Sequence, residues 1–155
     1  MHYLIDGHNL IPKIRSLSLQ DMDDEEKLIA MLNRFSTKVR AQVEVYFDKA
    51  PLDSARSVPI GSVKVHFIKT GISADAAMIE RMRKIGVSTK GYLIVSSDHA
   101  IQNEARRMKF KVMLCEEFAM KMDNELTRSK EKRAKAPDLD EGEIEDWLKI
   151  FDNKN

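Results

Sequence analysis

Three apolar runs in this chain each lead into an aspartate, and this pattern constrains the fold more than any other. The runs are Tyr3–Ile5 before Asp6, Val43–Phe47 before Asp48, which Glu44 interrupts, and Tyr92–Val95, which Ser96 and Ser97 separate from Asp98. Short apolar runs that stop at polar or turn-forming residues predict buried strands. Each of these strands would therefore carry an acid out of the core at its last position or just beyond it.

Helical patterns separate the strands. Apolar residues recur at helical spacing between Leu28 and Val39, and Ser73 is a suitable N-cap for a helix that runs to about Ile85. A further helix is expected from His99 to Met108, and further strands at Val63–Ile68 and Phe110–Leu114. Strands that alternate with helices predict an α/β fold whose central sheet is mainly parallel, joined by right-handed crossovers.

Composition limits the class of protein. The chain has 155 residues, 43% hydrophobic and 33% charged, which is typical of a globular domain. Its net charge of +1 gives no global basic field, so contact with a nucleic acid must use local patches. The single cysteine, Cys115, fits a reducing compartment, and no stretch approaches the roughly 18 apolar residues of a membrane span. We expect a cytoplasmic protein that does not cross a membrane.

Charge and hydrophobicity divide the chain into three parts. Residues 1–122 form the expected domain, which ends with a short helix from Glu116 to Met122. Residues 123–140 are strongly charged and predict a partly helical linker. Residues 141–155 contain Ile144, Trp147, Leu148 and Phe151 at helical spacing, which predicts an amphipathic helix. Its apolar face is expected to dock on the domain, with a partner protein as the alternative.

The acids indicate a site. Because the carboxyl ends of parallel strands share one edge of a sheet, Asp6, Asp48 and Asp98 can converge there with Asp75, near the start of the third helix. Two carboxylates ~5 Å apart at an effective dielectric of ~20 repel by about 3 kcal/mol. Such a group must hold protons or a cation. Ligation by oxygen alone points to Mg²⁺ or Mn²⁺, which can activate water and stabilise the leaving oxygen in phosphodiester cleavage.

Other interpretations of the same residues remain open. Asp6 can simply cap a helix, and Asn9 can serve as a cap as well. A receiver domain would carry an acidic pair after its first strand, where this chain has Gly7 and His8. A haloacid-dehalogenase phosphatase would carry a second aspartate at the position of His8. Asn9 and Ser97 could orient water or bind a phosphate oxygen.

A long connection follows Asp48. Residues 49–61 contain Pro51, Pro59 and Gly61 and predict a loop of about a dozen residues, a length that often marks a functional segment. Lys49 and Arg56 lie in this loop and could meet a polyanion near the strand ends. The alternative is that both are ordinary solvated cations.

The ordered motifs resemble a known family. The stretch from Leu4 to Leu10 looks like the opening of the NYN domains, specifically the bacterial YacP-like branch of the PIN-like nucleases. The similarity continues through the residues around Asp48, Asp75 and Asp98 and through the ending from Glu143 to Phe151. The chain departs from the pattern at Ala76, where many relatives carry a second acid, so the number of metal ions stays open.

The resemblance implies a fold and a function. The fold would be a PIN-like three-layer α/β/α sandwich, and the activity a Mg²⁺- or Mn²⁺-dependent endoribonuclease. Carried over by position, Asp6, Asp75 and Asp98 would bind metal, with Asp48 and Asn9 as catalytic neighbours. From their own positions in the chain, Lys49, Arg56 and Ser97 are the expected substrate contacts. The expected partner is single-stranded mRNA or rRNA, with the translation machinery as a further candidate. Two rival hypotheses are an RNA-binding or ribosome-associated module without efficient cleavage and a Mg²⁺-binding switch domain.

Overall fold

A six-stranded sheet forms the centre of the computed structural model, which describes residues 1–15, 17, 23–48, 56–68 and 72–135, with the backbone only for residues 56 and 129–135. The strands are β1 (His2–Asp6), β2 (Gln42–Phe47), β3 (Arg56–Ile60), β4 (Val63–Phe67), β5 (Tyr92–Val95) and β6 (Lys111–Met113). Their order across the sheet is β3-β4-β2-β1-β5-β6. Each neighbouring pair is parallel except β3 with β4. The mainly parallel sheet is as predicted.

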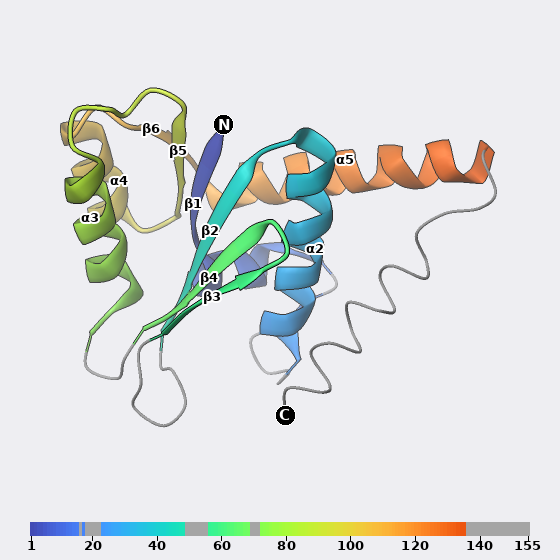
Figure 1. Ribbon diagram of the computed structural model, residues 1–155, viewed down its shortest axis with the longest axis horizontal. Coiled ribbons are helices and arrows are strands. Elements are labelled where there is room, and N and C mark those ends of the chain that lie inside the picture. The colour runs from blue at the N-terminus through green and yellow to red at the C-terminus, as the bar shows by residue number, and fades with distance from the viewer. Residues whose placement is uncertain (16, 18–22, 49–55, 69–71, 136–155) are drawn as a thin grey trace.

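Helices cover both faces of this sheet (Figure 1). They are α1 (Gly7–Leu10), the 3-10 helix η1 (Ile11–Lys13), α2 (Asp24–Val39), α3 (Ala74–Ile85), α4 (His99–Arg107) and α5 (Cys115–Lys135). The helices α2 and α5 pack on one face, and α3 and α4 on the other. This arrangement is the three-layer α/β/α sandwich that the family resemblance implied.

Alternation along the strands gives each face its own core. In β1, Tyr3 and Ile5 point toward α2 and α5, while Leu4 points toward α3 and α4. On the first face, Tyr3, Phe35 and Phe118 form an aromatic group with ring centroids 5.2–5.5 Å apart. Successive residues of a strand face opposite sides of a sheet, so a short apolar run can be buried on both faces.

The segment predicted as a loop from 49 to 61 contains strand β3. Arg56–Ile60 pairs antiparallel with β4, and Gly61, with φ at 60°, lies in the tight turn between them. Pro59 obscured this strand, because proline lacks a backbone N–H and argues against a central strand. It is tolerated here because β3 lies at the edge of the sheet.

The last described helix is much longer than predicted. The sequence suggested a helix from Glu116 to Met122, but α5 runs from Cys115 to Lys135 without interruption. The predicted boundary at residue 122 therefore falls inside a helix, and residues 123–135 of the predicted linker are helical. Its charged residues are good helix formers, and Met122 and Leu126 continue the buried stripe. The predicted C-terminal helix, 141–155, lies outside the described residues and stays a prediction.

A buried carboxylate ties α3 to the sheet. Glu44 of β2 is 4% exposed and accepts hydrogen bonds from Nε and Nη2 of Arg81 on α3, at 3.1–3.3 Å. Nε2 of His2 lies 2.5 Å from this carboxylate, and Nε2 of His66 lies 2.9 Å from it. His66 is largely covered and stacks on Tyr46 with ring centroids 4.5 Å apart.

No helix among the described residues is long and apolar enough to span a bilayer.

Candidate active site

The predicted carboxylates follow three neighbouring strands. Asp6 is the last residue of β1, Asp48 comes directly after β2, and Asp98 lies three residues beyond the end of β5. Because β2, β1 and β5 are adjacent and parallel, all three acids lie at the same edge of the sheet. Asp75 reaches this edge from the first turn of α3. The four residues are called the carboxylate cluster below.

Three of these acids also hold backbone amides. Asp6 caps α1 by accepting from the backbone N–H of Asn9 at 3.5 Å, and Asp98 caps α4 by accepting from Ile101 at 3.0 Å. The carboxylate of Asp48 accepts a hydrogen bond from the backbone N–H of Ala74, next to Asp75. The capping interpretation of Asp6 is thus confirmed, alongside its place in the cluster. Asn9 does not cap a helix; its side-chain amide donates to Asp6 Oδ2 at 2.5 Å.

Burial and mutual repulsion change the acidity of the cluster. Burial, together with the nearby charges of Asp75 and Asp48, raises the pKa of Asp6 to about 6, although hydrogen bonds from Asn9 oppose the shift. Burial also raises the pKa of Asp75, and the charges of Asp98 and Asp48 add to this effect. The four carboxylates therefore act on one another electrostatically, as the sequence predicted. A cation placed among them would relieve this repulsion.

The type of ligand in the cluster fits a hard divalent cation. Carboxylate oxygens are the donors that Mg²⁺ and Mn²⁺ prefer. Within the part of the chain that the structure describes, however, no three acidic, histidine or cysteine side chains stand close enough together to hold an ion as they are. The cluster supplies suitable donors without a ready coordination shell, so side-chain rotation would have to accompany metal binding.

Of the three predicted substrate contacts, the structure describes the side chain of Ser97. Ser97 Oγ donates to Glu116 Oε1 at 3.2 Å and accepts from the backbone N–H of Cys115 at 3.3 Å, so it links the end of β5 to the start of α5. Arg56 opens β3, and its side chain is not described; Lys49 lies outside the described residues. Cys115 is buried, which raises the pKa of its thiol to about 11.

Sequence reasoning missed a histidine at the rim of the cluster. His8 faces Glu25 of α2 with 3.0 Å between Nε2 and Oε1, and the backbone N–H of Asp48 donates to its Nδ1 at 3.4 Å. The hydrogen bond to Glu25 raises the pKa of His8. Glu25 lies in the first turn of α2, between Asp24 and Glu26. Its contact with His8 could not be read from the sequence, because 17 residues separate the partners.

Gly7 is needed for close packing. A Cβ atom at this position would lie 2.6 Å from Phe47 Cδ1 and 2.9 Å from the backbone oxygen of Tyr46. The close neighbour is β2 itself, and this contact fixes the distance between the residues that follow β1 and those at the end of β2.

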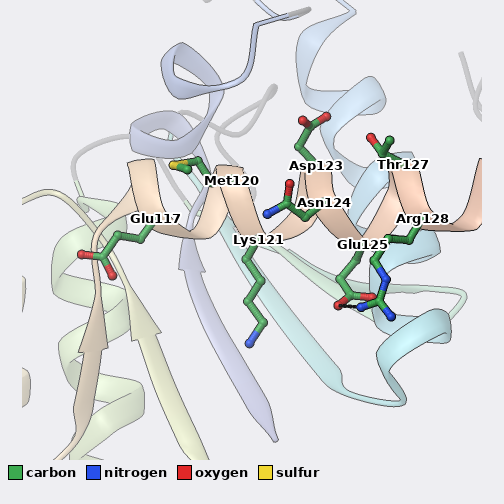
Figure 2. A pocket seen from close by; sticks show the side chains of 8 residues that line it. All are labelled: Glu117, Met120, Lys121, Asp123, Asn124, Glu125, Thr127 and Arg128. Atoms are coloured by element: carbon green, nitrogen blue, oxygen red, sulfur yellow. Dashed lines mark ion pairs between the residues drawn. The ribbon is translucent and has the colours of Figure 1, made fainter.

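The described cavities lie elsewhere. Figure 2 shows eight side chains of α5, between Glu117 and Arg128, that line a cavity of about 840 Å³. A second cavity, of about 490 Å³, lies where the end of η1, α2 and α5 meet, with Met31 and Met120 in its wall. The carboxylate cluster lines neither of them. Asp48, Asp75 and Asp98 are partly exposed at the sheet edge, where a long polymer can approach more readily than it could enter a closed pocket.

Comparisons with known proteins agree with this architecture. A family model described as the YacP-like NYN domain matches residues 3–151. The crystal structure of Rae1 (YacP) from Bacillus subtilis is 19% identical, with a TM-score of 0.73, and the match covers 98% of this chain and 92% of that one. A tryptophan-to-leucine variant of Rae1 matches at 16% identity and a TM-score of 0.69, covering 94% and 91%. No curated protein sequence matches. The structural matches confirm the predicted PIN-like fold.

Proposed function

This chain belongs to the YacP-like NYN domain family, a family of PIN-like nucleases, and from that premise we propose that it is a metal-dependent endoribonuclease. The observation that carries the proposal is the carboxylate cluster. Four acids from three strand ends and one helix start gather at one partly exposed edge, and their proximity raises the pKa of Asp6 and Asp75. A domain has little reason to keep such mutual repulsion unless a cation or a reaction uses it.

Asp6, Asp75 and Asp98 would hold the Mg²⁺ or Mn²⁺ ion. When bound, the ion would supply an activated water and stabilise the leaving oxygen of the phosphodiester. Asn9 holds the Asp6 carboxylate through its side-chain amide. Asp48 links the end of β2 to the start of α3 through Ala74, and so positions Asp75 against the cluster.

The substrate we propose is single-stranded RNA, mRNA or rRNA, bound in the cytoplasm and in contact with the translation machinery. Lys49 and Arg56 flank the connection that follows Asp48 and would bind phosphates beside the cluster. Ser97 would contact the substrate from the β5 side. Reversing both cations to glutamate should weaken RNA binding and reduce its salt dependence. An unchanged affinity and salt slope would remove this loop from the proposal.

The alternative is an RNA-binding module that cleaves weakly or not at all. The observation that favours it is that no three potential ligands in the described part of the chain stand ready to hold a metal. The two functions differ in one result: the binding module retains RNA in the presence of Mn²⁺ without producing fragments.

The test is incubation of the full chain with end-labelled single-stranded RNA, with Mg²⁺, Mn²⁺ or a chelator. We expect internal cleavage that needs the metal and falls by more than about a hundredfold in Asp6→Asn. Asp23→Asn is the matched control, because Asp23 precedes α2, makes no side-chain capping bond and lies outside the cluster. Equal cleavage by Asp6→Asn and the parent would overturn the assignment of the site.

A further inference from the structure

Positive charge gathers at the end of the sheet away from the carboxylate cluster. Residues 81–111 contain eight Lys or Arg and two Asp or Glu, a net charge of +6, whereas the rest of the chain carries a net −5. Five exposed members of this group form what is called the distal basic surface: Lys84, Lys90, Arg106, Lys109 and Lys111. The near-neutral total of the chain therefore hides a strongly uneven distribution.

The fold brings these five residues together. The helices α3 and α4 pack side by side and run opposite to the strands, so their last turns lie at the same end of the sheet (Figure 1). Lys84 and Arg106 lie in those last turns, Lys90 and Lys109 in the turns that follow, and Lys111 opens β6. Tyr92, the first residue of β5, and Phe110, which precedes β6, pack against each other in the core of this face with ring centroids 6.2 Å apart. Lys109 and Lys111 therefore lie on either side of a buried aromatic residue, Phe110.

The surface is not neutralised locally. Two acids lie next to it, and both are already engaged: Glu80 pairs with Arg83 at 3.6 Å, and Glu104 pairs with Arg107. Among the residues that the structure describes, no carboxylate forms an ion pair with any of the five cations. Helix dipoles favour basic residues in a last turn, which accounts for Lys84 and Arg106 but not for the other three.

Lys109, just after the end of α4, adopts a left-handed backbone conformation that residues other than glycine disfavour. Its φ is 72°, and the end of α4 is closed by hydrogen bonds from Lys109 N to Arg106 O and from Phe110 N to Ala105 O. This is the helix ending in which the residue at the left-handed position is usually glycine, because a Cβ atom is disfavoured there. A lysine at this position weakens the helix end relative to glycine, and its side chain is exposed.

We propose that the distal basic surface binds the phosphate backbone of RNA, as a second contact separate from the carboxylate cluster. The identity of the polyanion rests on the proposed function; the surface itself does not. Exposed cations without carboxylate partners suit a contact with phosphates that ignores base sequence. The 12 residues of α3 separate the two sites by about 18 Å at ~1.5 Å per residue. An RNA that touches both must therefore span roughly five stacked nucleotides at ~3.4 Å each.

Replacing Lys109 by glycine tests the proposal, because the substitution should raise stability and lower RNA affinity. Lys109→Gly should raise the melting temperature by about 2–4 °C by relieving the backbone, and should weaken binding of a 20-nucleotide RNA about threefold. Arg40→Gly is the matched control. Arg40 is also an exposed cation with positive φ, 54°, at the end of a helix, but that helix, α2, lies on the other face of the sheet. The Arg40→Gly substitution should stabilise the fold and leave RNA binding unchanged.

Binding is measured by fluorescence anisotropy of the full chain in chelator, so that no cleavage intervenes, at several salt concentrations. Replacing Lys84, Lys90, Arg106 and Lys111 together by glutamine should raise the dissociation constant more than about tenfold and reduce the salt slope by about three. A dinucleotide contacts too few phosphates to engage all of these cations, so its affinity should fall much less. Equal RNA affinities for the parent, Lys109→Gly and the fourfold variant would overturn the inference. The inference would also be overturned if the fourfold variant lost binding to vesicles containing phosphatidylserine but kept the RNA affinity of the parent.

The outcome separates this inference from the proposed function. Metal-dependent cleavage with RNA affinity insensitive to all five cations would leave the nuclease standing and remove the distal surface. RNA affinity that depends on these cations, in a protein that never cleaves, would retain the surface and remove the nuclease.

Discussion

The side-chain amide of Asn9 donates a hydrogen bond to Asp6 Oδ2 at 2.5 Å, less than one turn along the chain. Of the interactions that lower the pKa of Asp6, this hydrogen bond has the largest effect, so it favours the ionised carboxylate. Burial outweighs it, because Asp6 is only 3% exposed and its pKa rises to about 6. The chain therefore holds its central carboxylate in a position where charge is costly without a cation.

Asp6→Asn should stabilise the metal-free protein at neutral pH. The folded-state pKa of about 6 lies above the ordinary value of 3.8, so the contribution of Asp6 to stability is complete below pH 3.8 and is lost as the pH rises through 6. Ionised Asp6 then costs up to about 3 kcal/mol. Denaturant unfolding in chelator should show a gain near pH 7.5 that vanishes near pH 4. A gain independent of pH would contradict the electrostatic origin.

Asp98→Asn should weaken metal binding without loosening α4. Asparagine caps a helix about as well as aspartate, so the hydrogen bond from Ile101 N is kept while the charge is removed. Calorimetry should show reduced Mn²⁺ affinity, and the metal-dependent rise in melting temperature should shrink. Asp23→Asn serves as the control. If Mn²⁺ binds Asp98→Asn as tightly as the parent, Asp98 is not a ligand.

Glu44→Gln should destabilise the fold by about 2 kcal/mol, because it leaves the Arg81 guanidinium without its carboxylate in a largely covered site. Burial alone would raise the pKa of Glu44, but hydrogen bonds from His2, His66 and Arg81 hold it far below its usual range. The stability that Glu44 contributes is therefore present above pH 4.5 and falls away as the pH drops below that value.

The check is denaturant unfolding of Glu44→Gln across pH 3–7, beside Glu80→Gln. Glu80 pairs with Arg83 on the exposed side of α3, so its loss should change stability little. The difference between Glu44→Gln and the parent should be largest near pH 7 and shrink in acid. Equal changes in the free energy of unfolding for the two substitutions would show that the buried contacts of Glu44 with His2, His66 and Arg81 do not stabilise the fold more than a surface ion pair does.

Gly7→Ala should destabilise the protein by about 1–3 kcal/mol through overpacking. The new methyl group would press on the Phe47 ring and lie 2.9 Å from the backbone oxygen of Tyr46. Thermal melting measures the loss. Adding Phe47→Leu, which removes the ring, should recover part of the loss caused by Gly7→Ala but not all, because the Tyr46 oxygen remains. Additive losses in the double variant would place the strain elsewhere.

Much of this molecule follows from local sequence signals. The parallel strands, the N-cap Ser73 and the convergence of Asp6, Asp48 and Asp98 were all predicted, since each rests on hydrophobic periodicity and the geometry of a parallel sheet. Strand β3 was missed because an edge position, which tolerates Pro59, is a property of the assembled sheet. The length of α5 was missed because charge along residues 123–135 resembles a linker unless the packed stripe is known.

The polar networks could not be foreseen. Glu44 has the pattern of an ordinary strand residue, and its partners lie 22 to 42 residues away in β1, β4 and α3. His8 likewise meets Glu25 only after α2 folds back over the end of β1. Such pairs arise from tertiary contacts between distant residues, for which periodicity carries no signal.

Pro59 in the outer strand has a consequence for how copies of this protein meet. A bare sheet edge invites a strand from another molecule, because its N–H and C=O groups seek partners, and this is a common route to aggregation. Strand β3 lacks one backbone N–H donor, because Pro59 has none. At the opposite edge of the sheet, β6 is only three residues long. Neither border of the sheet is a good template for a further strand, so the sheet resists growth from one molecule into the next.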